Sequence, residues 1–328
     1  EHIEEAGIHS GDSSCTLPPI TLGPDIIAKV KDATEKIARG TGVRGLINIQ
    51  FAYVSENLYV IEANPRASRT VPFVSKATGV QLAKAAVLIG LGKTIAELKA
   101  EGYLPQHMDG ASLPQETAIA VKAAVLPFAR FRTPEGVVVD SLLSPEMRST
   151  GEVMGLDQHF DTAFAKAQAG AGSPMPTSGK VFISVANHDK RNVIIYAKML
   201  ESLGFEIVST GGTAEILRRN GLNSILVASK FAEANGDHSI VDMVRNGDID
   251  LILNTPAGGA ARSDGYEIRA AAVSVGCPVM TTISEFAAAV QAITALREHS
   301  WDIMSLQEHD VKLAAAVDAR LASEGGEA

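Results

Sequence analysis

The sequence is poor in cysteine, in aromatic residues and in positive charge. Its 328 residues include only two cysteines, Cys15 and Cys277, and 5% aromatic residues. Two cysteines are too few for a disulfide framework, and no Cys-x-x-Cys pair or cysteine–histidine array indicates a zinc site. We therefore expect a reducing compartment, with the cytoplasm as the default localisation.

Long apolar runs and a basic surplus are also missing. No apolar stretch approaches the roughly 18 residues needed to cross a bilayer, and no positively charged segment precedes an apolar one at the acidic N-terminus. The net charge of −9 argues against nucleic acid as a main partner. We expect neither a membrane nor a nucleic-acid partner. The length and a hydrophobic content of 46% predict about two domains with ordinary cores.

A β-hairpin with a polar face is the first informative pattern. Residues 45–62 alternate apolar with polar side chains around a polar turn centred on Glu56. Cross-strand partners then sum to a constant, and four polar side chains share one face, pairing as Gln50 with Glu62 and Asn48 with Asn64.

Such a face suits a hard divalent cation. Mg²⁺ takes one or two carboxylates and completes its shell with phosphate oxygens and water. Arg66 and Arg69 follow directly, and their guanidinium groups are suited to clamping a phosphate or carboxylate. Spacing alone leaves another interpretation open, a solvated hairpin face with a charged exit loop.

Three segments carry a family resemblance. Residues 62–76 resemble the metal-binding signature of the ATP-grasp enzymes, and specifically the second ATP-grasp module of carbamoyl phosphate synthetase large subunits. Residues 1–13 and 144–155 resemble the same family, so the resemblance covers nearly the whole chain. It implies an α/β fold whose first part is the C-terminal part of an ATP-grasp α+β domain.

The resemblance also implies roles for individual residues. Gln50, Glu62 and Asn64 would hold Mg²⁺ or Mn²⁺, and Arg66 and Arg69 would act on phosphate and the carbamate-derived substrate. ATP would be a substrate, with these nucleotide-binding residues: His9, Ser10, Gln50 and Glu62. Such a site works by positioning and charge neutralisation during phosphoryl transfer.

The same resemblance implies missing parts. The chain would begin inside the ATP-grasp module, so the remainder of the large subunit would be a partner, as would a small glutamine amidotransferase subunit that supplies ammonia. The complete ligase would make carbamoyl phosphate for pyrimidine and arginine biosynthesis. We expect that this chain alone neither binds ATP tightly nor turns it over.

A change of pattern divides the chain. Residues 169–179 are small residues with two prolines, which predicts a linker between a domain at 1–168 and another at 180–328. In the second domain, short apolar runs alternate with helical patterns, which predicts a doubly wound parallel sheet with a ligand site beyond the carboxyl ends of its strands. Strands are expected at 180–186, 205–209, 224–227, 249–253 and 278–280, and helices at 189–203, 212–220, 239–246, 263–274 and 284–298.

Two loops at those strand ends have phosphate-binding chemistry. Residues 209–213, Ser-Thr-Gly-Gly-Thr, follow a strand and open a helix, and they offer backbone N–H groups, hydroxyls and a positive dipole end. Residues 254–259 form a second such loop, and Lys190 and Lys230 could supply cations. Tight turns and solvated lysines are the plain alternative for each feature taken singly.

This half resembles the methylglyoxal-synthase-like domain that ends carbamoyl phosphate synthetase large subunits and binds uridine monophosphate (UMP). The likeness implies that a UMP-like effector is held by Lys190, Thr210, Thr213, Lys230, Asn254 and Thr255. Pro256 stands where the family often has a second threonine. Ala123 stands where some members add a third carboxylate to those at Glu4 and Asp12 for ornithine, so we expect weak or absent ornithine regulation.

Two other interpretations stay open. The second domain could be catalytic, as in methylglyoxal synthase or the cyclohydrolase that closes the inosinate ring. Residues 254–261 contain no acid to act as the base of methylglyoxal synthase, which counts against the first of these. Alternatively, the chain could be a stand-alone regulatory module that couples effector occupancy to a neighbouring active site.

Overall fold

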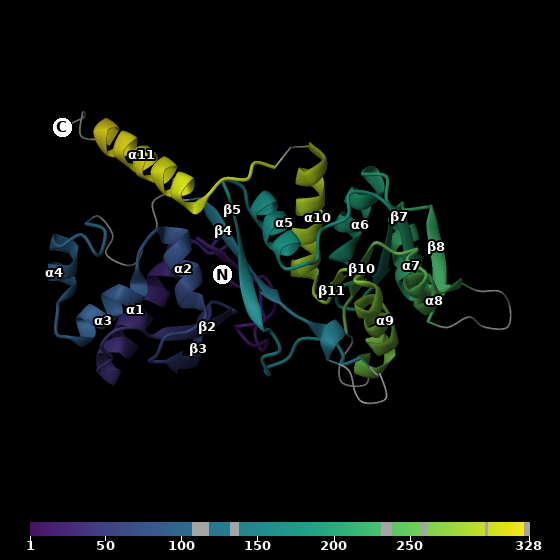
Figure 1. Ribbon diagram of the computed structural model, residues 1–328. Coiled ribbons are helices and arrows are strands. Elements are labelled where there is room, and N and C mark those ends of the chain that lie inside the picture. The colour runs from purple at the N-terminus through teal and green to yellow at the C-terminus, as the bar shows by residue number, and fades with distance from the viewer. Residues whose placement is uncertain (107–117, 132–137, 231–237, 257–260, 299–300, 325–328) are drawn as a thin grey trace.

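The protein has two units side by side in the computed structural model (Figure 1). The structure describes residues 1–106, 118–131, 138–230, 238–256, 261–298 and 301–324. The N-terminal unit contains a small antiparallel sheet, a separate hairpin and short helices, whereas the C-terminal unit is built on a parallel sheet. The molecule is therefore an α/β protein, as the sequence predicts.

The C-terminal sheet has six parallel strands in the order β11-β10-β6-β7-β8-β9. Its strands are β6 (Lys180–Ser184), β7 (Glu206–Ser209), β8 (Ile225–Ser229), β9 (His238–Ser239), β10 (Leu251–Asn254) and β11 (Val279–Met280). All five strands expected from the sequence are present within a few residues. The two-residue β9 was not expected, because so short a strand leaves no alternation to read.

Helices cover both faces of this sheet. They are α6 (Val193–Ser202), α7 (Gly211–Arg219), α8 (Ile240–Arg245), α9 (Ala261–Val275) and α10 (Ile283–Glu298). Val181 and Ile183 of β6 belong to the apolar cluster that includes α6, α7 and α10, whereas Phe182 belongs to the cluster with α8 and α9. This alternation along one strand explains the nearly continuous apolar sequence of β6.

The N-terminal unit contains the antiparallel sheet β1-β4-β5, formed by β1 (Cys15–Leu17), β4 (Ile119–Val125) and β5 (Gly151–Asp157). Its helices are α1 (Pro24–Thr41), α2 (Thr70–Thr78), α3 (Leu82–Gly90), α4 (Ile95–Ala100) and, after β5, α5 (Phe160–Gly170), with a 3-10 turn η1 (Phe128–Arg130) after β4. Ala120 of β4 packs in a cluster with α2, and Val121 packs in the larger cluster that contains α5. Both faces of β4 are therefore covered.

The hairpin consists of β2 (Asn48–Val54) and β3 (Asn57–Asn64), and its register matches the prediction at the polar end. Asn48 pairs with Asn64, and Gln50 pairs with Glu62. The turn is tighter than predicted, because Ser55 and Glu56 alone form it, with φ of 49° and 64°. A bulge after Gln50 adds one residue to β3 and restores the predicted partners.

Helix α5 lies between the antiparallel sheet of its own unit and the C-terminal unit (Figure 1). Phe164 is fully buried in the cluster that also contains residues of β6, β7 and α10. On the other side the backbone of α5 lies directly on β5, where a Cβ on Gly155 would stand 2.0 Å from the Ala163 carbonyl oxygen. Residues 171–179 join α5 to β6 without helix or strand, and Met175 among them is buried.

The last helix, α11 (Leu306–Glu324), runs back above the N-terminal unit (Figure 1). Within the described part of the chain, no helix combines the length and apolar character required to cross a bilayer.

Candidate functional site

A cavity of about 660 Å³ in the N-terminal unit gathers five of the residues implied by the resemblance. It is bordered by residues 9–11, which precede β1, by β2 and β3, and by the start of α2. The implied residues that line it are His9, Ser10, Glu62, Arg66 and Arg69; Asn48, Lys122 and Met147 line it as well. Gln50 and Asn64, the other two implied metal ligands, are not among the lining residues.

The hairpin positions the oxygen ligands. Gln50 and Glu62 are cross-strand partners, and so are Asn48 and Asn64, which places all four on one face because side chains alternate along a strand. Glu62 is exposed and the other three are half-buried. One carboxylate flanked by amide oxygens is a fitting donor set for Mg²⁺ or Mn²⁺ only if further oxygens come from a bound phosphate.

The two arginines differ in how firmly they are held. Arg69 Nη1 donates to Ser149 Oγ at 2.7 Å and to the Ser149 carbonyl at 3.1 Å, so its guanidinium is fixed to the β5 side of the cavity. Arg66 is exposed and donates only locally, to the Ala67 carbonyl at 3.1 Å, among the bonds of the described residues. Arg69 is thus pre-positioned, whereas Arg66 remains adjustable.

Lys122 is a cavity residue that the sequence did not single out. Its side chain is 2% exposed and its Nζ donates to the Ser10 carbonyl at 3.0 Å. It comes from β4, on the same face as Ala120, and it brings a positive charge to the segment of His9 and Ser10. A lysine inside an otherwise apolar strand was the available signal, because a buried lysine needs partners.

The second set of implied residues gathers at the carboxyl ends of β6, β7 and β10. The strand order reverses here, since β7 and β8 lie on one side of β6 and β10 lies on the other. In open α/β sheets, ligands bind in the crevice at such a reversal. Thr210 and Thr213 come from the start of α7, and Asn254 and Thr255 from the end of β10.

Three threonine hydroxyls shape the loop after β6. Thr210 Oγ1 lies 3.1 Å from Ser184 Oγ, Thr213 Oγ1 accepts from Val185 N at 3.3 Å, and Thr255 Oγ1 accepts from Ala186 N at 2.8 Å. Each hydroxyl that accepts in this way keeps its own O–H to donate. The arrangement therefore fixes the loop and leaves donors for an anionic group.

The two lysines have different surroundings. A Cβ on Gly212 would lie 3.4 Å from Lys190 Nζ, which places the Lys190 ammonium beside the first turn of α7. Lys230, after β8, forms an ion pair with Glu267 of α9 at 2.7 Å, and this hydrogen bond lowers the pKa of Glu267. Part of the predicted loop 254–259 lies outside the described residues.

Asn254 is tied to a residue that the sequence did not suggest. Arg269 of α9, which is 0% exposed, donates from Nη1 to Asn254 Oδ1 at 2.8 Å. The same guanidinium donates from Nε and Nη2 to the two carboxylate oxygens of Asp140, at 2.7 and 2.8 Å.

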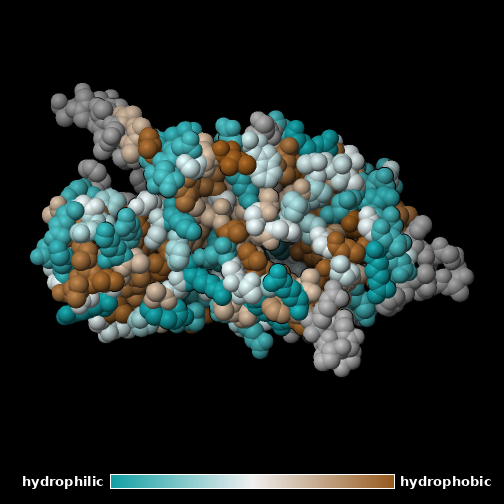
Figure 2. Space-filling view, viewed as in Figure 1, coloured by the Kyte–Doolittle hydropathy of each residue, from teal (hydrophilic) through white to brown (hydrophobic). Residues whose placement is uncertain are grey.

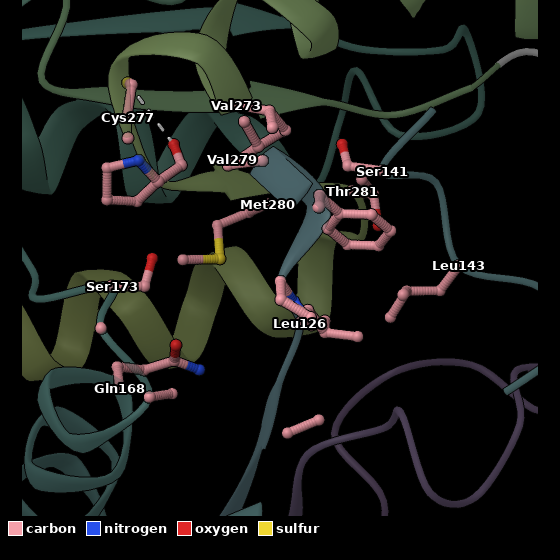
Figure 3. A pocket seen from close by; sticks show the side chains of 18 of the residues that line it. Leu126, Ser141, Leu143, Gln168, Ser173, Val273, Cys277, Val279, Met280 and Thr281 are labelled. Atoms are coloured by element: carbon pink, nitrogen blue, oxygen red, sulfur yellow. Dashed lines mark hydrogen bonds between the residues drawn. The ribbon is translucent and has the colours of Figure 1, made fainter. Parts of the chain in front are cut away.

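A separate cavity of about 300 Å³ lies between the units, where the end of β4, residues near Ser141, the end of α5 and β11 meet (Figure 3). Glu285 lines it.

Of the residues named for ornithine, Glu4 accepts from Ser13 Oγ at 2.6 Å and Ser14 N at 2.7 Å, and both Asp12 oxygens accept backbone N–H groups. Ala123 is buried in the core.

Family models match a segment in each half of the chain. Residues 2–98 match the family model described as "Carbamoyl-phosphate synthase L chain, ATP binding domain", and residues 192–281 match the one described as "MGS-like domain". These two matches fall on the hairpin cavity and on the strand ends of the parallel sheet.

Whole proteins give a consistent result. The carbamoyl phosphate synthase large chain of Kocuria rhizophila is 70% identical over 95% of this chain and 28% of its own length. Those of Micrococcus luteus and Streptomyces coelicolor are 66% and 58% identical, each over 97% of this chain and 29% of their own length. The chain thus spans under a third of the curated relatives it matches. By these similarities it belongs to the family of carbamoyl phosphate synthase large chains.

Proposed function

We propose that the chain provides part of an ATP-dependent ligase that makes carbamoyl phosphate from bicarbonate, glutamine-derived ammonia and ATP. The N-terminal unit contributes metal and nucleotide ligands to the site that phosphorylates carbamate. The observation that carries this proposal is the convergence of Glu62, Arg66, Arg69, His9 and Ser10 on one cavity. The remaining length of such a large chain and a small glutamine amidotransferase subunit are the partners this function requires, in the cytoplasm.

The metal would be Mg²⁺ or Mn²⁺, held by Glu62, Gln50 and Asn64. When bound, it would neutralise charge on the phosphates of ATP. No group of three or more His, Cys, Asp or Glu side chains suited to a metal occurs within the described ranges. One carboxylate with amides would make a weak site until a nucleotide supplies phosphate oxygens.

The arginines would act on the transferred group. Arg69, fixed by Ser149, supplies a guanidinium whose position does not have to be established during the reaction, and such pre-organised charge is the main means of stabilising phosphoryl transfer. Arg66 is free to follow the substrate. Both roles are electrostatic.

A carboxylate-to-amide change at Glu62 tests this assignment. The reaction to follow is the formation of ATP from ADP and carbamoyl phosphate in the presence of the metal. In the full-length large chain that contains this segment, Glu62→Gln should lower the rate of this reaction about 100-fold. Glu56→Gln, in the exposed turn of the same hairpin, is the matched control and should leave the rate unchanged. Equal rates for the two variants would refute the role of Glu62.

The C-terminal unit would bind a UMP-like effector through Lys190, Thr210, Thr213, Lys230, Asn254 and Thr255. We expect saturable UMP binding to this chain by calorimetry, with loss of binding in a Lys190→Ala, Thr213→Ala double variant. Inosine monophosphate serves as the comparison ligand. A preference for inosine monophosphate, or binding that survives the double variant, would show that the effector assignment is wrong.

A further inference from the structure

Arg269 joins the two units at a buried position. Its guanidinium forms a two-pronged ion pair with Asp140, which precedes it by 129 residues, and its remaining arm reaches Asn254. Side-by-side N–H donors matched to both carboxylate oxygens give the strongest and most directional form of such a pair. The guanidinium is fully buried, so these contacts are not exchanged freely with water.

This contact fixes the orientation of the Asn254 amide. A guanidinium has donors only, so the amide must turn its oxygen toward Arg269 and its NH₂ group away from it. The packing leaves no slack, because a Cβ on Gly265 would stand 2.3 Å from both Arg269 Nη1 and Asn254 Oδ1. Arg269 thus determines that Asn254 presents donors rather than an acceptor to its other neighbours.

Further contacts connect Asp140 to the 660 Å³ cavity of the N-terminal unit. The Asp140 carbonyl accepts from Arg148 Nη1 at 3.5 Å, and the backbone N–H groups of Arg148 and Ser149 donate to the carboxylate of Asp12 at 2.7 and 2.9 Å. Ser149 then accepts from Arg69 Nη1. Hydrogen bonds, together with the covalent bonds within Asp140 and Arg148 and the peptide bond from Arg148 to Ser149, therefore connect Asn254 to Arg69.

Neighbours of Arg269 on α9 make parallel connections. Tyr266 donates from its hydroxyl to the Val138 carbonyl at 2.6 Å, and Glu267 pairs with Lys230 at 2.7 Å. Three nearby positions of one helix thus hold two of the implied effector residues and two points of the segment that leads to Ser149. A displacement of α9 would therefore change contacts both with the implied effector residues and with the segment that leads to Ser149.

We propose that Arg269 is a positioning residue that orients Asn254 for the effector and transmits effector occupancy to Arg69 through Asp140. This rests on the proposed effector-binding function of the C-terminal unit. A ligand shifts an equilibrium only by its differential affinity for the two states. The proposal therefore requires that the effector binds the arrangement with Arg269 bonded to Asn254 and Asp140 with a different affinity from an arrangement in which these bonds are changed.

Hydrogen exchange with and without UMP tests the proposal on this chain. Saturating UMP should slow exchange of backbone amides in residues 138–150 of the wild type. Asp140→Asn keeps the size of the side chain and removes its charge; UMP should still bind, and the slowing at 138–150 should fall by at least half. Glu215→Gln is the matched control, because it neutralises the carboxylate partner of Arg219 in an exposed ion pair, and it should behave as the wild type.

A second variant tests the orientation of Asn254. Arg269→Lys keeps the positive charge but cannot contact Asp140 through two nitrogens and Asn254 through a third, so its dissociation constant for UMP should rise about tenfold or more. Wild-type affinity in a folded Arg269→Lys protein would overturn the positioning role.

The outcomes separate this inference from the function on which it rests. If UMP binds and Asp140→Asn shows the wild-type slowing at 138–150, Asp140 has a structural role only and the inference is overturned. If UMP binds the wild type without any change at 138–150, the inference also fails, while effector binding stands. Failure of the wild type to bind UMP would refute both.

Discussion

Glu285 illustrates how strongly a single half-buried carboxyl can respond to its surroundings. Burial, and secondly the neighbouring carboxyl of Glu4, raise the pKa of Glu285 to about 8. Burial likewise raises the pKa of Glu4. Glu285 also stabilises the first turn of α10, since its Oε2 accepts from Thr281 N at 3.1 Å and its own N–H donates to Thr282 Oγ1 at 3.2 Å.

The raised pKa predicts a pH-dependent stability. Between pH values near 4.5 and 8 the folded state retains a proton on Glu285 that the unfolded state has released, so the unfolded state binds fewer protons. Stability therefore falls as the pH rises through this window. Glu285→Gln should raise the melting temperature at pH 8 more than at pH 5 and flatten the profile.

Thermal unfolding from pH 5 to pH 8.5 provides the measurement. Glu298→Gln, at the exposed end of the same helix, is the control and should follow the wild-type profile. A Glu285→Gln profile parallel to that of the wild type would mean that Glu285 is ionised in the folded protein.

Individual site residues were predictable to different degrees. Glu62, Arg66 and Arg69 stand in one short segment, and their chemistry is legible from residue type and strand alternation. Arg269 and Asp140 were not predictable, because a contact across 129 residues leaves no periodicity in the sequence and because charged residues are usually exposed. Glu285 was expected only as part of a helix.

Among the elements, the contact between α5 and β5 gives a sharp prediction. Gly155→Ala would place a methyl group 2.0 Å from the Ala163 carbonyl oxygen and 2.6 Å from Ala167 N, both backbone atoms of α5. The helix would have to move, so we expect a loss of about 3 kcal/mol in the free energy of unfolding. Chemical denaturation followed by far-UV circular dichroism measures it.

Gly151→Ala, at the start of the same strand, is the control because nothing lies within 4 Å of the added Cβ. Its unfolding free energy should stay within about 0.5 kcal/mol of the wild type. Similar stabilities of the two alanine variants would contradict the close packing of α5 on β5.

Elements were predictable where periodicity is clean. Helix α1 has Pro24 at its start and Gly42, with φ of 64°, at its end, and both signals stand in the sequence. Helix α2 was missed because Thr70, Val71 and Pro72 are poor helix formers outside a first turn. Strand β5 was missed because its two glycines lower strand propensity, while the second of them is needed for the approach of α5.

At the scale of the whole molecule, burial is unevenly distributed. No residue of α1, β2 or β3 is buried, whereas β10 is buried throughout and β6 in its three central residues. Segments with few buried apolar contacts open at low free-energy cost. Because α5 joins both units in one core, the difference in burial does not simply follow the division into units. It also occurs within the N-terminal unit.

Hydrogen exchange of the free chain should reveal this gradient. We expect amides of β2 and β3 to exchange at least tenfold faster than those of β6 and β10, although all four are hydrogen-bonded strands. Amides of β4, which has both faces covered, are the internal control from the N-terminal unit and should be protected like those of β6. Equal protection of the hairpin and β6 would contradict the gradient.

The hairpin also affects how the chain behaves in concentrated solution. It is a two-stranded ribbon whose outer edges have no further strand in the described part of the molecule. Exposed large side chains lie along it and at α3, and they are Val54, Tyr59, Val60, Ile61, Val87 and Leu91. Figure 2 shows hydrophobic surface, in brown, at the lower left, where Figure 1 places these elements. Open edges beside apolar surface favour self-association, which the net charge of −9 opposes. Because salt screens that repulsion, the isolated chain should remain monodisperse in dilute buffer and lose colloidal stability as salt is added.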